Sequence, residues 1–179
     1  MKSNRLALIL VAVLGIVSCK NNDHLFRLVS PEKSGIDFTN TITINDTINI
    51  LESEFTYNGG GVAVGDLNGD GLQDIYFAGN QVQNKLYINK GELKFEEVIE
   101  KAGAHKTKGQ WSSGVTFVDI NGDNRQDIYV CNTMLSDSSL LRDLLFVNQG
   151  NTKEGIPQFK EMGIEYGIHD NTQNSISLN

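Results

Sequence analysis

A long internal repeat constrains the fold of this chain more than any other feature of its sequence. Three sets of positions align in order: 61–77 with 114–130, 86–91 with 145–150, and Phe95 and Gly103 with Phe159 and Gly167. The offset grows along the chain, so the second copy carries two insertions. We place them in the loop-like stretches 134–141 and 152–157, because loops absorb changes in length at little cost.

Each copy contains four short stretches typical of β-strands, and no segment with a helical period competes with them. We expect strands at 62–64, 75–77, 86–88 and 95–98 in the first copy, and at 115–118, 128–130, 145–147 and 159–162 in the second. Four short antiparallel strands per repeat are typical of a β-propeller blade. The predicted fold class is therefore all-β, an incomplete propeller of about two blades. Such a fragment needs further blades or self-association to cover its faces.

The first residues form an export signal. Lys2 and Arg5 precede an apolar run at 6–17, which is too short to span a bilayer and is typical of a secretory signal. Ser18 and Cys19 end this run and a polar stretch follows, an arrangement that resembles a bacterial lipobox. The resemblance implies cleavage before Cys19, acylation of that residue, and anchoring at the outer membrane or cell surface. An ordinary signal peptide with a chance cysteine is the alternative.

The remaining boundaries follow from changes in composition. Residues 36–44 alternate apolar and polar side chains, which favours strands ahead of the first repeat. The predicted organisation is a lipoprotein signal peptide at 1–18, a polar tether at 19–35, leading strands at 36–58, the first repeat at 59–110, the second repeat at 111–168, and the start of a truncated third repeat at 169–179.

Both copies contain the same oxygen-rich loop, Asp-x-Asn-x-Asp-x-x-x-Asp. The candidate ligands are the side chains of Asp66, Asn68, Asp70 and Asp74 with the carbonyl of Leu72, and the side chains of Asp119, Asn121, Asp123 and Asp127 with the carbonyl of Arg125. Calcium takes six to eight oxygen ligands, whereas magnesium keeps several waters and uses few protein ligands. The loops therefore predict two structural calcium sites.

Two other interpretations of the loops are weaker. An EF-hand needs a glutamate at loop position twelve and flanking helices, but Phe77 and Val130 stand there between β-forming segments. A metal-free turn would leave three carboxylates repelling one another. Gly71 permits the sharp turn in the first loop, and Asn124, which tolerates left-handed geometry, replaces it in the second.

The runs at 57–71 and 84–91 resemble FG-GAP/VCBS repeats, as in the propeller of the integrin α-subunit. The chain is most similar to bacterial surface lipoproteins related to the ASPIC/UnbV and cartilage-acidic-protein group. The resemblance extends from about 35 to 167 and implies a calcium-stabilised propeller displayed outside the cell. The chain stops at Asn179, where the first strand of a third blade is expected.

The net charge of −7 argues against nucleic acid as a partner and leaves the lipid anchor as the link to a membrane. No Ser/His/Asp or Cys/His set can be argued from spacing, so we expect no enzyme activity. The predicted role is binding or scaffolding, with a polysaccharide or a protein as ligand. A non-catalytic propeller portion of a larger surface enzyme is the alternative, and a truncated gene product is a third.

Cys19 provides a direct test of the export prediction. In a Gram-negative host given labelled fatty acid, the wild-type chain is expected to incorporate label and to fractionate with membranes. Cys19→Ser removes the sulfur that is acylated and should abolish both. Equal labelling of the two proteins, or a soluble wild-type product, contradicts the lipid anchor.

Overall fold

Two antiparallel four-stranded sheets form the body of the protein, in a computed structural model that describes residues 25–52, 54–133 and 140–168. The first sheet, in the order β1-β2-β3-β4, consists of β1 (Val62–Gly65), β2 (Asp74–Phe77), β3 (Lys85–Asn89) and β4 (Phe95–Glu97). The second, in the order β5-β6-β7-β8, consists of β5 (Ser112–Val118), β6 (Asp127–Asn132), β7 (Leu144–Asn151) and β8 (Pro157–Glu161). The eight predicted strands and the all-β fold class are confirmed. We call the two sheets blade 1 and blade 2.

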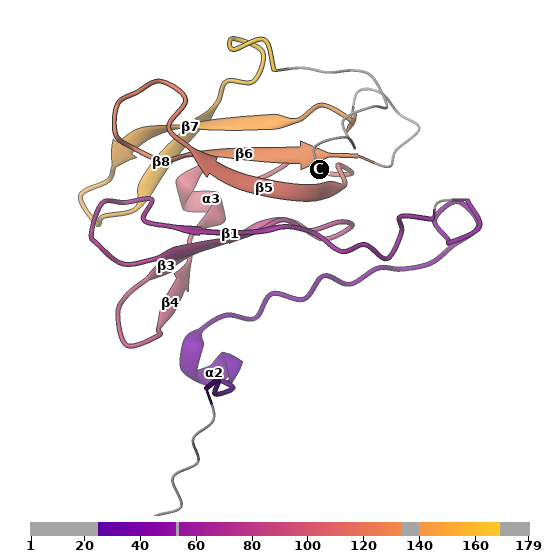
Figure 1. Ribbon diagram of the computed structural model, residues 1–179, viewed down its shortest axis with the longest axis horizontal. Helices are drawn as coiled ribbons and strands as arrows, with labels where there is room; N and C mark the ends of the chain where they lie inside the picture. The colour runs from indigo at the N-terminus through magenta and orange to yellow at the C-terminus, as the bar shows by residue number, and fades with distance from the viewer. Residues whose placement is uncertain (1–24, 53, 134–139, 169–179) are drawn as a thin grey trace, which may run out of the picture.

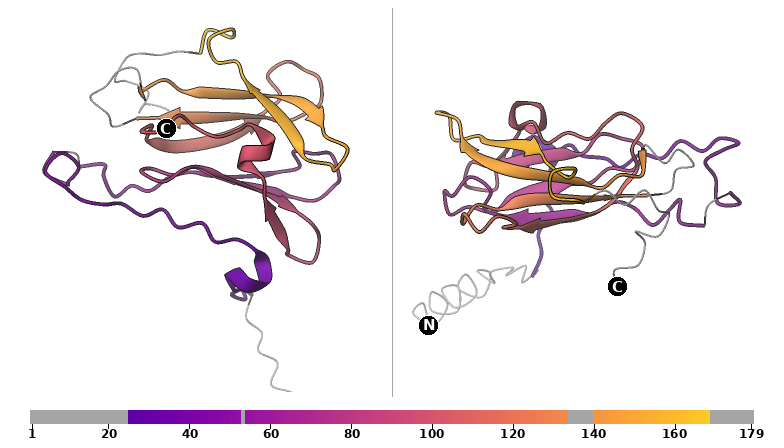
Figure 2. Two further views of the ribbon diagram at one scale, coloured as in Figure 1. Left: turned by 180° about the vertical axis from the view of Figure 1, so that it is seen from behind. Right: turned by 90° about the horizontal axis from the view of Figure 1, so that it is seen from above.

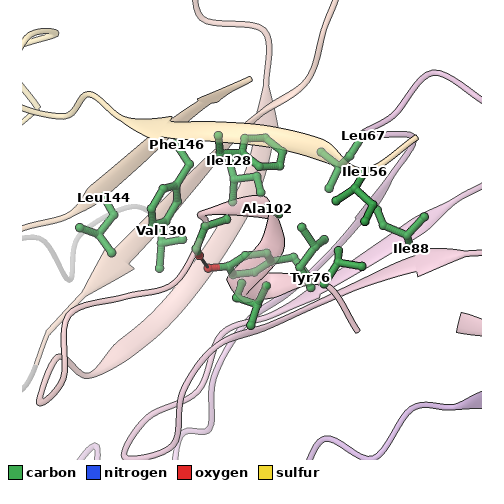
Figure 3. Packing of buried hydrophobic residues seen from close by; sticks show 14 residues of the cluster. Leu67, Tyr76, Ile88, Ala102, Ile128, Val130, Leu144, Phe146 and Ile156 are labelled. Carbon is green, nitrogen blue, oxygen red and sulfur yellow. Dashed lines mark hydrogen bonds between the residues drawn. The ribbon is translucent and has the colours of Figure 1, made fainter. Parts of the chain in front are cut away.

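The blades pack face to face, and one apolar core fills the space between them (Figures 1 and 3). Alternate residues of each central strand point into this core, as Tyr76 does from β2 and as Ile128 and Val130 do from β6. The short helix α3 (Ile99–Ala102) connects the blades and lies between them, with Ile99 and Ala102 in the same core. The sequence did not predict this helix, because one turn is too short to show a helical period.

The first strands of the two blades approach closely because glycine stands at the contact. A Cβ atom on Gly61 would lie 2.7 Å from the backbone nitrogen of Val115 and 2.9 Å from Cα of Gly114. Real Cβ atoms do not tolerate such distances, so any other residue at position 61 would push the blades apart. Gly61 at the start of the first repeat therefore serves the packing of one blade on the other.

The predicted leading strands at 36–58 are wrong for the residues that the structure describes, since 36–52 and 54–58 contain no strand. The chain leaves a short helix, α2 (Pro31–Ser34), and runs extended along the outer side of blade 1 (Figures 1 and 2). Because this segment crosses the face of blade 1, its backbone has no neighbouring strand edge to pair with. Apolar and polar residues alternate because one side of the extended segment packs against blade 1 and the other faces solvent. An extended chain can show this pattern without belonging to a sheet.

Side chains attach this leading segment to blade 1. The ring of Phe38 stacks on Phe77 with centroids 4.8 Å apart, and the hydroxyl of Tyr87 donates to Asp37 Oδ1 at 2.7 Å. Asn40 and Asn80 exchange two further hydrogen bonds, of 2.6 and 3.0 Å. Blade 2 thus covers one face of blade 1, and the leading segment covers part of the other, where Val62 and Val64 of β1 stay exposed.

The signal sequence with Cys19, and the expected third repeat at 169–179, lie outside the described residues. Within the described part of the chain, no helix is long and apolar enough to cross a membrane.

Candidate metal-binding loops

The loop between β1 and β2 is organised around the carboxylate of Asp66. Its Oδ1 accepts the backbone N–H groups of Gly69 (2.7 Å) and Asp70 (3.1 Å), and its Oδ2 accepts that of Gly71 (2.8 Å). The side chain of Asp70 in turn accepts the N–H of Leu72 at 2.8 Å. These bonds fold the backbone back over the carboxylates, so the oxygen-bearing side chains of the loop stay close together.

The loop between β5 and β6 has the same arrangement. Asp119 accepts the N–H groups of Gly122 (2.8 Å), Asp123 (3.1 Å) and Asn124 (2.9 Å). Asn124 adopts a φ of 64°, so the left-handed geometry predicted at this position is confirmed. In both loops the amide of the middle Asn donates to the following Asp, at 3.0 Å in the first and 2.9 Å in the second.

The last carboxylate of each loop is buried and joins the loop to the sheet. Asp74, with no exposed surface, accepts the N–H of Leu67 at 2.9 Å and the N–H of Asn89 at 2.9 Å. Asp127 likewise accepts the N–H groups of Ile120 (3.0 Å) and Asn148 (2.7 Å). One side chain therefore links the start of the loop, the second strand and the end of the third strand.

The three acidic side chains of the first loop influence one another. Burial, together with a smaller effect of the charges of Asp70 and Asp66, raises the pKa of Asp74 to about 6, against the two backbone hydrogen bonds, which lower it. Like charges affect a pKa in this way only at short range. The loop thus concentrates negative charge at one place in blade 1.

This donor set fits a hard cation, because every candidate ligand is an oxygen. In the first loop Asp66, Asp70, the amide of Asn68 and the carbonyl of Leu72 would hold it, with Asp74 closing the set. Across the described residues, however, no group of three or more His, Cys, Asp or Glu side chains is placed to hold a metal ion. Occupancy of both loops by calcium, and the ligand role of Asp74 and Asp127, therefore stay predictions.

Hydrogen bonds from blade 2 hold the first loop, and we call this set of contacts the clasp. The amide of Asn148 donates to the carbonyl of Leu67 at 2.9 Å, and that of Asn151 donates to the carbonyl of Asn68 at 2.6 Å. The Asn68 amide donates in return to the carbonyl of Gly155 at 3.3 Å. Leu67 and Ile156 also meet in the core beneath these contacts (Figure 3). The first loop is therefore part of the interface between the blades.

Asn89 and Asn148 are equivalent in the repeat, and each has a role in its loop that spacing does not predict. Each accepts the N–H of the glycine two residues later at 2.9 Å and donates to the carbonyl of the glutamine that precedes the closing carboxylate, at 3.0 and 3.2 Å. The signal was present in the Asn-x-Gly that ends the aligned segments 86–91 and 145–150. Spacing alone could not show that this motif folds back onto the loop.

Residues 66–130 match the family model of the FG-GAP-like repeat. The match begins at the first carboxylate of the first loop and ends within β6, so it contains both loops. No curated protein matches the chain. The match supports an FG-GAP-like repeat protein, and the two antiparallel sheets agree with propeller blades of that type.

The clasp can be measured by comparing Asn148 with its counterpart Asn89. Asn148→Ala removes the bond to Leu67 of the other blade as well as the bonds within blade 2, whereas Asn89→Ala removes only bonds within blade 1. Losing a partner of a buried polar group costs about 1–3 kcal/mol. We expect Asn148→Ala to lower the free energy of unfolding in urea by about 1–2 kcal/mol more than Asn89→Ala. Equal losses would show that the contact between blades adds nothing.

Proposed function

We propose that this chain is a calcium-stabilised propeller-repeat protein, lipid-anchored at the cell surface, with a binding or scaffolding role. The observation that carries the proposal is the repetition of one oxygen-lined loop, with the same hydrogen bonds, once in each blade, and both loops lie within the FG-GAP-like match. FG-GAP repeats are in general binding units without catalytic activity. The ligand would be a polysaccharide or another protein.

Electrostatics favours a cation in the first loop. Among the ion pairs of the described residues, none involves Asp66, Asp70 or Asp74. Three carboxylates close together without a basic partner raise the free energy of the folded state through mutual repulsion. A divalent cation would turn that repulsion into attraction, and calcium suits a flexible set of oxygen ligands.

The calcium would have a structural role, and the residues that hold the loop determine which parts of the protein it stabilises. Asp66 and Asp70 shape the turn, Asp74 ties it to β3, and Asn148 and Asn151 tie it to blade 2. An ion held by these oxygens would stiffen the turn and, through it, the contact between the blades. Stiff blades keep their exposed loops in fixed positions, which a binding or scaffolding surface requires.

Calcium titration tests this proposal. We expect two sites on the wild-type chain, with dissociation constants of about 10⁻⁴–10⁻³ M, as in extracellular modules. Because the ion binds the folded loop, calcium at about ten times the dissociation constant should raise the free energy of unfolding by about 1.4 kcal/mol per site. Calorimetry gives the stoichiometry, and unfolding with and without calcium gives the stabilisation.

Asp70→Ala removes a ligand from the first loop and should reduce the stoichiometry from two to one. Asp46→Ala, which removes an exposed acid in the leading segment, is the control and should keep both sites. A flat titration on wild-type protein that circular dichroism shows to be folded would contradict the calcium proposal.

A further inference from the structure

The two loops differ at three positions, one of them a predicted ligand: Ile120 conservatively replaces Leu67, and the other two changes are larger. Asn124 replaces Gly71, and Arg125 replaces Leu72. The side chain of Leu72 carries no charge, but the guanidinium of Arg125 turns back over its own loop. Its Nη2 donates to Asp123 Oδ2 at 2.6 Å, and its Nε donates to the carbonyl of Asn148 at 3.4 Å. The other hydrogen bonds that shape the two loops agree to within a few tenths of an ångström.

The guanidinium contacts an oxygen that a cation would need. Asp123 Oδ2 accepts both the Asn121 amide, at 2.9 Å, and Arg125. The equivalent oxygen of Asp70 accepts the Asn68 amide, at 3.0 Å, and forms no ion pair among the described residues. A cation entering the second loop must therefore displace the guanidinium from Asp123 Oδ2 or share that oxygen with it. It also meets one positive charge that the first loop lacks.

We propose that Arg125 is a built-in counter-ion that makes the second loop the weaker of two unequal calcium sites. This inference rests on the proposed function, because it concerns the same loops. Calcium affinity in oxygen-lined loops depends on the charge of the ligands. An ion pair at a partly exposed position changes an equilibrium by roughly three- to fivefold. The cation must compete with this ion pair and also meets an added positive charge, so we expect calcium to bind the second loop about three- to tenfold more weakly than the first.

Unequal sites would affect the contact between the blades. Because blade 2 clasps the first loop, the stronger site would lie at the interface between the blades. Calcium at intermediate concentration would then stiffen this interface while Arg125 still neutralises Asp123 in the second loop. At such a concentration the first loop would hold a calcium ion, whereas in the second loop the guanidinium of Arg125 would supply the positive charge.

The experiment follows each loop separately by NMR. The amides of Gly69 and Gly122 donate to the first carboxylate of their loops and report on them individually. In the wild-type chain, titrated with calcium chloride to about 10 mM, Gly122 should saturate at a three- to tenfold higher concentration than Gly69. Arg125→Leu copies the first loop and should bring the two midpoints together. Leu72→Arg copies the second loop and should weaken the Gly69 response by a similar factor.

Two control variants separate the ion pair from other causes. Asn124→Gly removes the other non-conservative difference between the loops, the left-handed non-glycine residue, and should leave the difference between the Gly69 and Gly122 midpoints in place. Arg142→Leu removes the same charge from an ion pair with Glu161 in blade 2 and should also leave it. The role of Arg125 is overturned if either control makes the Gly69 and Gly122 midpoints equal, or if the midpoints still differ in Arg125→Leu.

The outcomes also distinguish this inference from the proposed function. Equal midpoints for Gly69 and Gly122 in the wild-type chain would refute the inequality and leave calcium binding intact. No response of either amide to calcium in wild type and in Arg125→Leu would refute both.

Discussion

The buried carboxylates of Asp74 and Asp127 are the interaction on which the rest of this structure depends. Each sits where its blade admits no solvent, and each accepts one N–H from the start of its loop and one from the third strand. Burying a carboxylate is costly unless hydrogen bonds satisfy it, and bonds to a charged acceptor are among the stronger ones. A single side chain therefore fixes how the loop leaves the first strand and where the third strand must end.

From these two anchors the contacts extend outward. The loop that Asp74 holds presents the carbonyls of Leu67 and Asn68 to blade 2, where Asn148 and Asn151 bind them. The same residue Asn148 gives its backbone N–H to Asp127. The anchor of one blade is thus connected through a few hydrogen bonds to the anchor of the next. Both copies of the repeat in this chain thus combine an acidic loop with an Asn-x-Gly motif that lies later in the sequence.

The sequence predicted the parts of the fold that have a period. Strand positions followed from the repeat, and the left-handed turn at Asn124 followed from its place opposite Gly71. The leading segment was predicted wrongly, because alternation along 36–44 arises equally when an extended chain covers the face of a sheet. The helices α2 and α3 span four residues each and leave no periodic signal. In the loops, the sequence suggested which oxygen atoms would bind a metal, and that stays a prediction. It did not show the ion pair of Arg125, because the geometry of this pair depends on the direction of a long side chain.

Amide hydrogen exchange in Asp74→Asn, in the presence of a calcium chelator, tests the central role of the buried carboxylate most directly. The N–H groups of Leu67 and Asn89 bind different oxygens of Asp74, and a carboxamide replaces one of these oxygens with an NH₂ group, so one of the two N–H groups loses its acceptor. Losing a hydrogen bond to a charged group costs about 1.5–3 kcal/mol, so one of these two amides should exchange at least about tenfold faster than in wild type. The amides of Ile120 and Asn148, held by Asp127 in blade 2, should change less and serve as the internal reference. Wild-type exchange rates at both Leu67 and Asn89 would contradict the account.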